Sequence, residues 1–228
     1  MLPLDVTSDA SVKAAVAEVI RREGRIDLLV NNAGFNVAVG GAEESSIQQA
    51  QDIFDTNFFG TVRMSLAVVP HMRQQGSGRI INIGSVAGMV GKDHRVYDGT
   101  TMGGVTIDYA AAKGGVINMT REMACWLARY NIRVNCISAG PVNTLAARGI
   151  AGFQDMLRHY ELKAQLKRNV TADELGAHGT SPESDGDDVD AALPDVEEVL
   201  RAATDLLDEP VATTREGVVD GEPAEGPR

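Results

Sequence analysis

Tyr109 and Lys113 stand four residues apart in the stretch Asp108–Val116, and three alanines separate them. Alanine is the strongest helix former, so this spacing predicts a helix that stacks the phenol and the ammonium on one face. A tyrosine with an ordinary pKa of about 10 is a poor base near neutral pH. A neighbouring ammonium favours the phenolate and would bring the pKa of Tyr109 toward the working range. The pair is a candidate for proton transfer, although such i,i+4 pairs also occur as ordinary surface features.

The elements that must position this pair alternate along the chain. Apolar strand-like runs cover residues 26–30, 78–85 and 132–138, and helical patterns cover residues 12–22, 47–74 and 109–130. This alternation predicts an α/β fold of βαβ units, with a doubly wound, Rossmann-like parallel sheet. Ligands of such sheets lie beyond the carboxyl ends of the strands. The residues expected there are Asn31 to Gly34, Ser85, and residues 138–144.

The chain has 228 residues and is long enough for one sizeable core. Its charged residues are unevenly distributed along the sequence. The formal net charge is −11, which argues against nucleic acid or an anionic membrane as a partner. Residues 171–228 hold 17 of the 32 acidic residues. We therefore expect a folded core over residues 1–170 and an acidic flexible linker over 171–194. A possible last helix and strand follow over 195–221, and residues 222–228 are expected to be a disordered tail.

The two cysteines, Cys125 and Cys136, have apolar neighbours and belong to no His/Cys cluster with metal-ligand spacing. We expect reduced thiols and no metal. The sequence starts without a basic region, and no apolar stretch reaches the ~18 residues of a membrane helix. The interpretation is a soluble, cytoplasmic protein.

Several segments together resemble the short-chain dehydrogenase/reductase family, in the order in which that family carries them. The resemblance covers roughly residues 2–170, with a weaker echo over 195–221. It implies an oxidoreductase that uses NAD or NADP and transfers a hydride between nicotinamide and a small-molecule secondary alcohol or ketone. The segments are Asp5-Val6-Thr7, Asn31-Asn32-Ala33-Gly34, Asn57 in DTNFFG, Ser85 in INIGSVAG, Tyr109 with Lys113, and RVNCISAGPVNT from Arg133.

The resemblance also implies a role for each catalytic candidate. Tyr109 is the acid/base, and Lys113 supports it and holds the nicotinamide ribose. Ser85 donates a hydrogen bond to the substrate oxygen where charge develops. Asn57 supports a water-mediated proton path to Lys113. From the residue types alone, Ser85 could equally end a strand and Asn57 could be a solvated helix residue.

The cofactor-binding candidates come from the same resemblance. Asp5 and Val6 are expected beside the adenine, although an aspartate in this setting is also an ordinary turn or cap residue. The turn after the first strand is expected to form the floor of the adenine side. Residues after the last strand are expected to face the nicotinamide carboxamide and the phosphates. The full set is Asp5, Val6, Asn31, Ala33, Gly34, Tyr109, Lys113, Gly140, Val142 and Thr144.

The chain departs from the family pattern at two places. The glycine-rich phosphate loop and first βαβ unit should precede Asp5, so the sequence predicts an N-terminally truncated core with weak cofactor binding. The spacing Gly84, Gly88, Gly91 imitates that loop but follows the strand that carries Ser85. In addition, 24 positions separate Ser85 from Tyr109, about twice the usual distance. Residues 92–104 therefore look like an insertion that reshapes the substrate pocket.

Alternatives stay open at this stage. Residues after Ile137 resemble enoyl-acyl-carrier-protein reductases, but those enzymes place the tyrosine seven residues before the lysine, where this chain has Thr106. A cofactor-deficient, catalytically weak fragment or an interaction partner is the third interpretation. By the resemblance, a homodimer or homotetramer would pair through the helices expected over residues 47–74 and 103–130. The substrate, and NAD against NADP, are not determined by the sequence.

Overall fold

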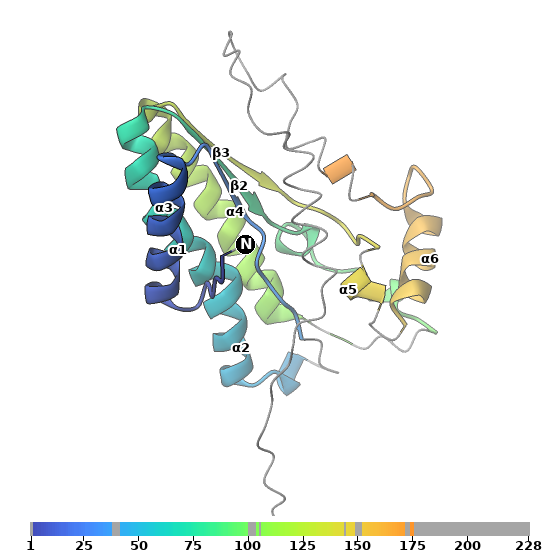
Figure 1. The fold of residues 1–228 in the computed structure, drawn as a ribbon. Coiled ribbons are helices and arrows are strands. Elements are labelled where there is room, and N and C mark those ends of the chain that lie inside the picture. The colour runs from blue at the N-terminus through green and yellow to red at the C-terminus, as the bar shows by residue number, and fades with distance from the viewer. Residues whose placement is uncertain are drawn as a thin grey trace, which may run out of the picture.

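A three-stranded parallel sheet forms the centre of the computed structural model, which describes residues 2–37, 42–99, 104, 106–143, 145–148, 152–171 and 174–175. The strands β1 (Leu28–Asn31), β2 (Gly78–Ile83) and β3 (Ile132–Ile137) lie in the order β1-β2-β3 (Figure 1). Cα partners are Leu29 with Ile80 and Ile80 with Val134. The predicted parallel α/β sheet is confirmed. The expected domain divisions over 176–228 lie outside the described residues.

Helices α1 (Asp9–Glu23), α3 (Gly60–Gln75) and α4 (Ile107–Leu127) supply apolar side chains to one face of this sheet. Residues on alternate positions of each strand share that face, and their register brings them into one layer. This layer is buried against the helices and forms the main core. It consists of Val16, Leu29, Val68, Met72, Ile80, Leu127, Ile132 and Val134.

The first strand begins two residues later than the sequence predicts. Ile26 donates its backbone N–H to Gln75 Oε1 at 3.0 Å, and Gln75 Nε2 donates to the Ile26 carbonyl oxygen at 2.9 Å. A side chain of α3 therefore takes both backbone groups that a strand would use. Register with β2 begins at Leu28, which is paired with Arg79.

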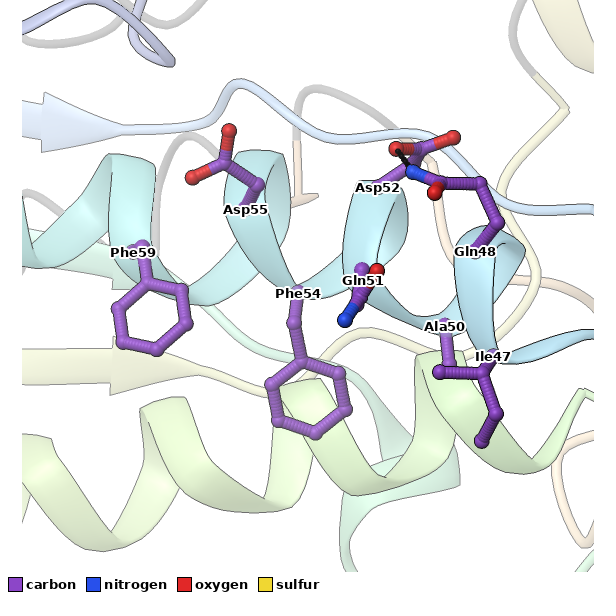
Figure 2. A pocket seen from close by; sticks show the side chains of 8 residues that line it. All are labelled: Ile47, Gln48, Ala50, Gln51, Asp52, Phe54, Asp55 and Phe59. Carbon is purple, nitrogen blue, oxygen red and sulfur yellow. Dashed lines mark hydrogen bonds between the residues drawn. The ribbon is translucent and has the colours of Figure 1, made fainter.

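The long helix expected over residues 47–74 is three elements. The α2 helix (Ile47–Phe54) passes into a π-helical turn, η2 (Asp55–Phe59), and then into α3. Figure 2 shows apolar side chains along one side of the first two elements and Asp52 and Asp55 on the other. Ile47 and Phe59 on the apolar side are 77% and 48% exposed, so the described residues leave this side largely uncovered. The π turn matters because it carries Asn57, and such turns are frequent at functional sites.

A buried polar network ties the strands to the helices behind them. Asn31 Nδ2 donates to Asn82 Oδ1 at 2.8 Å and to Ser65 Oγ at 3.3 Å, and Asn82 Nδ2 donates to Thr120 Oγ1 at 2.9 Å. All four residues are buried. Because buried polar groups are costly unless bonded, this network fixes β1 and β2 against α3 and α4 in one arrangement.

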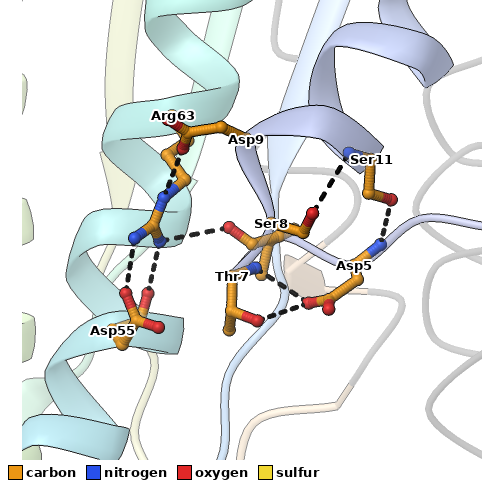
Figure 3. Close-up of polar contacts among 8 residues, drawn as sticks. Asp5, Thr7, Ser8, Asp9, Ser11, Asp55 and Arg63 are labelled. Atoms are coloured by element: carbon orange, nitrogen blue, oxygen red, sulfur yellow. Dashed lines mark hydrogen bonds and ion pairs between the residues drawn. The ribbon is translucent and has the colours of Figure 1, made fainter.

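Arg63 of α3 anchors the N-terminal turn. Its guanidinium contacts Asp9 Oδ1 at 2.9 Å and Asp55 Oδ1 at 2.6 Å, and it donates to the Val6 carbonyl oxygen at 3.3 Å (Figure 3). A Cβ on Gly60 would lie 2.8 Å from Val6 Cγ2, so Val6 packs directly on the α3 backbone. These contacts hold the turn of Asp5 against η2.

The bonds of Arg63 predict a measurable effect on stability. Arg63→Met should lower the free energy of unfolding by about 1–2 kcal/mol, because the carbonyl of Val6 and the carboxylate of Asp55 lose their shared partner. Arg21→Met is the matched control: its 2.7 Å pair with Glu18 is on the surface, with the Arg21 side chain 68% exposed, and its loss should leave the free energy of unfolding nearly unchanged. Urea denaturation measures both. Equal losses in the two variants would contradict the anchoring role.

Candidate active site

Ser85 lies directly after β2, in a turn that is pressed against α4. Its backbone is extended, and its Oγ accepts a hydrogen bond from the Ala87 N–H at 3.1 Å, which starts the 3₁₀ turn η3 (Val86–Gly88). A Cβ on Gly88 would lie 2.6 Å from the Gly114 nitrogen, a distance that no side chain tolerates. The glycine thus lets the turn approach the helix backbone. The segment with the spacing Gly84, Gly88, Gly91 forms the short turn η3 and does not start a long helix. It therefore lacks the helix start that a phosphate loop uses.

The close approach brings Ser85 to Tyr109. A side-chain hydrogen bond joins the two residues, and Ser85 is buried while Tyr109 is half-buried. Burial raises the pKa of the Tyr109 phenol above its ordinary value, and the hydrogen bond with Ser85 opposes that rise. The net lowering of this pKa expected from the helical pairing with Lys113 is not found, because desolvation outweighs the attraction of the ammonium. Lys113 Nζ lies 5.8 Å from the centroid of the Tyr109 ring and donates its hydrogen bond to the Ile83 carbonyl oxygen.

Lys113 is a buried cation at the carboxyl end of the sheet. Its Nζ donates to the Ile83 carbonyl oxygen at 2.6 Å, which fixes the side chain beside the last residue of β2. Only 5% of the residue is exposed, and this burial lowers the pKa of Lys113 to about 8. The ammonium therefore pays a desolvation cost that a nearby negative charge would offset.

Asn57 reaches the same place from the π turn. Its side chain donates to the Phe35 carbonyl oxygen at 2.8 Å and accepts from the Phe35 N–H at 2.9 Å, and it is fully buried. A Cβ built on Gly34 would lie 3.1 Å from Asn57 Oδ1 and 3.7 Å from Lys113 Nζ. The structure therefore brings Asn57, Lys113 and the Asn31–Gly34 turn close together, with Gly34 in tight contact with Asn57.

The residues predicted on the adenine side differ in what they can offer. Asp5 is exposed, and hydrogen bonds from the side chain and backbone of Thr7 lower its pKa. Ala33 is exposed at the same edge, whereas the Asn31 amide belongs to the core network. The Asn31 side chain is thus committed to the fold, which leaves its backbone to contact a ligand, and its role in cofactor binding stays a prediction.

The residues predicted beyond β3 lie next to α6 (Phe153–Lys163). A Cβ on Gly140 would lie 3.2 Å from the Tyr160 hydroxyl oxygen. Val142 makes a parallel bridge with Val170. Thr144, also predicted to bind cofactor, lies outside the described residues. The segment after β3 is thus held by contacts with Tyr160 of α6 and with Val170.

The segment that follows Lys92 packs against α6, a helix that the sequence patterns had not predicted. Asp93 Oδ2 lies 3.6 Å from Lys163 Nζ, and Tyr97 packs on a small apolar cluster of Phe153, Met156 and Leu157. Burial in this contact raises the pKa of Tyr97. The cluster explains why Tyr97 is a packing residue. The i, i+3, i+4 spacing of its apolar residues on α6 was the signal that would have revealed it.

Comparison with known proteins shows the family. The model of a family described as enoyl-(acyl carrier protein) reductase matches residues 1–180. The chain belongs to the short-chain dehydrogenase/reductase family.

Three named proteins illustrate the similarity. An L-fucose dehydrogenase from Bos taurus is 37% identical over 140 residues, which are 61% of this chain and 47% of that enzyme. The short-chain reductase protein NovJ from Streptomyces niveus is 40% identical over 184 residues, 76% of this chain and 63% of NovJ. A crystal structure of gluconate 5-dehydrogenase from Burkholderia cenocepacia J2315, in complex with NADP and tartrate, superposes with a TM-score of 0.65 at 31% identity. It covers 77% of this chain and 64% of that chain.

The match to the curated relatives is partial. The chain spans about half the length of the L-fucose dehydrogenase, and less than two thirds of NovJ. Of the helices in the described residues, none has the length and apolar character needed to cross a membrane.

The depressed pKa of Lys113 predicts a pH-dependent effect of its removal. In the folded chain the ammonium titrates near 8, and in the unfolded chain near 10.5. The unfolded state therefore holds the extra proton between these values, and the stability of the unsubstituted chain rises with pH there. Relative to Lys113→Met, it should gain on the order of 1–3 kcal/mol from pH 7 to pH 10. Urea denaturation at both pH values checks this, with Lys13→Met, an exposed lysine of α1, as control. A difference that does not change with pH would refute the buried cation.

Proposed function

We propose that this short-chain dehydrogenase/reductase oxidises a secondary alcohol, or reduces the corresponding ketone, with NAD or NADP as cofactor and Tyr109 as the acid/base. The observation that carries the proposal is the hydrogen bond between Ser85 and Tyr109 with Lys113 buried one helical turn further along α4. Two hydroxyl groups side by side suit one substrate oxygen, and a fixed cation behind them suits a developing phenolate.

Tyr109 and Ser85 have different roles at the substrate oxygen. The nicotinamide supplies or accepts the hydride when it is bound. In the reduction, the Tyr109 hydroxyl gives its proton to the carbonyl oxygen as the alcohol forms, and the Ser85 hydroxyl donates a hydrogen bond to the same oxygen. The negative charge then rests on the phenolate of Tyr109, close to the Lys113 ammonium. In the oxidation, the phenolate takes the proton of the alcohol.

The high pKa of the free phenol fits this scheme. Burial favours the neutral phenol in the absence of ligand, so Tyr109 starts as a proton donor. A positive charge next to the phenol favours the phenolate, and Lys113 supplies one only while it is protonated. Since the pKa of Lys113 is about 8, its ammonium form dominates at neutral pH. Asn57, beside Lys113 around Gly34, is the proposed route by which water returns the proton.

The space around Gly34 supports the cofactor assignment. We propose that Asp5 and Val6 lie by the adenine, and that Ala33 and Gly34 form the floor beneath the adenosine. Lys113 and Tyr109 would hold the nicotinamide ribose, with the backbone of Asn31, Gly140 and Val142 lining the rest and Thr144 included by resemblance. A Cβ on Gly34 would lie 3.1 Å from Asn57 Oδ1 and would press on that side chain, so glycine suits this floor.

A second candidate is the reduction of an enoyl thioester, favoured by the description of the matching family model. Thr106 stands where those enzymes would carry their tyrosine, and in this chain it is bonded to Lys92. Consumption of a crotonyl thioester would support this candidate. Titration with NADH and NADPH, followed by fluorescence, tests the third interpretation, a chain that binds cofactor too weakly to turn over.

Tyr109→Phe tests the proposed acid/base. The variant should lose ~10²–10⁴-fold in kcat, the usual range for a general acid/base, while cofactor affinity stays within a few-fold. Tyr97→Phe is the matched control, because its ring packs in the cluster on α6, and its kcat should change by less than about 5-fold. Steady-state kinetics of ketone reduction give the kcat of both variants. A Tyr109→Phe rate near that of the unsubstituted chain would exclude the assignment.

We also propose that two or four copies associate through the outer sides of α2, α3 and α4. Leu66 on α3 and Trp126 on α4 are 71% and 56% exposed, and both line one groove between these helices. Ile47 and Phe59 add further exposed apolar surface on α2 and η2 (Figure 2). Such surface is more than an isolated chain usually leaves in water.

Leu66→Glu tests this association. A charge in the groove should shift the assembly toward monomer, raising the dissociation constant at least ~10-fold. Leu162→Glu, on α6 with a side chain of similar exposure, is the control. Light scattering at micromolar concentration measures both, and a monomeric parent chain would contradict the proposal.

A further inference from the structure

Lys92 is a half-buried cation at the start of the insertion. Its Nζ donates a hydrogen bond to Thr106 Oγ1, and Thr106 is 7% exposed at the residue before α4. A hydroxyl oxygen offers no net negative charge. The ammonium of Lys92 is thus held in a partly dry setting by a neutral partner, and this burial lowers its pKa.

Among the described residues, no carboxylate forms an ion pair with Lys92. Asp93, next in the chain, pairs with Arg95 and Lys163, and Asp108 in the first turn of α4 accepts a hydrogen bond from Ser45. The start of a helix also carries partial positive charge, so it repels a cation. Buried charges are normally paired, so this arrangement is unfavourable until an anion joins it.

The position of Lys92 is next to the proposed chemistry. Thr106 and Tyr109 are three residues apart and share a face of α4. From Ser85 the chain touches α4 at Gly114 through Gly88 and then returns to Thr106 through Lys92, so it runs along the helix past Tyr109. The residues that follow Lys92 pack on the apolar cluster of α6. The chain on which Lys92 stands is therefore fixed at Thr106 and again on α6.

We propose that Lys92 binds a carboxylate of the substrate, so that the substrate class is a hydroxy acid or keto acid. This inference rests on the proposed function, whose site it completes. A carboxylate fits better than a phosphate, because a single ammonium matches one negative charge and the described residues place no arginine bond at Thr106. The anion would offset the desolvation of Lys92 and the repulsion from the start of α4.

The test compares two unreactive probes of equal shape, cyclohexanecarboxylate and cyclohexanecarboxamide. Ligand-observed NMR titration of the full chain, with and without NADH, gives the two dissociation constants. The carboxylate should bind about 10- to 100-fold more tightly than the amide, the range of a charge-assisted hydrogen bond. Lys92→Met should reduce that preference to within about 3-fold, and Lys92→Arg should keep most of it. Lys13→Met, on the exposed side of α1, controls for net charge and should keep it fully.

Each remaining outcome decides the matter. Equal binding of the two probes, no binding of the carboxylate at millimolar concentration, or a preference that survives in Lys92→Met would overturn the proposal. Circular dichroism of Lys92→Met separates a lost site from a lost fold. If that variant misfolds, Lys92→Gln takes its place, and a preference that survives in Lys92→Gln would equally overturn the proposal. Failure of the proposed reaction is distinguishable, because Tyr109→Phe removes turnover without removing the charge of Lys92 and should retain the carboxylate preference.

Discussion

The contact between the Ser85 turn and the backbone of α4 is the constraint on which the site depends. Gly88 meets Gly114 and Lys113 so closely that a single added carbon would lie 2.6 Å from backbone nitrogen. This distance sets where β2 ends relative to the helix. It places the Ser85 hydroxyl at Tyr109 and the Ile83 carbonyl oxygen at Lys113. Ser85, Tyr109 and Lys113 thus lie close together, because Gly88 and Gly114 allow the backbone of the turn to touch the backbone of α4.

The strands are held to this contact by polar groups that have no access to water. Asn31, Asn82 and Thr120 form a chain of hydrogen bonds from β1 through β2 to α4. An apolar core alone tolerates sliding of neighbouring elements more easily than a bonded polar network does. The network therefore fixes the register of the strand ends, where the candidate residues lie. Arg63 likewise fixes the turn of Asp5, through its bonds to the Val6 carbonyl oxygen and to Asp55.

Residues 92–99 connect two parts of the fold that are distant in the sequence. Lys92 bonds to the start of α4, and Tyr97 packs on α6. The helix α6 in turn approaches the segment after β3 through Tyr160 and Gly140. Residues that lie far apart in the sequence are thereby brought together beyond the carboxyl end of the sheet. The proposed substrate selection depends on these contacts, whereas the proposed proton-transfer residues belong to the sheet and α4.

The sequence alone determined the local structure and the candidate chemistry. Alanine content and spacing predicted α4 with Tyr109 and Lys113 one turn apart, and the alternation of apolar runs predicted the parallel sheet. Tertiary structure decided what depends on burial and on contacts across the chain. It raised the pKa of Tyr109, lowered that of Lys113, and committed the Asn31 amide to the core. It also replaced one predicted helix by α2, a π turn and α3, and joined the insertion to α6. The physical reason is that propensity and periodicity act between near neighbours, whereas desolvation and hydrogen bonding depend on which distant residues share a volume.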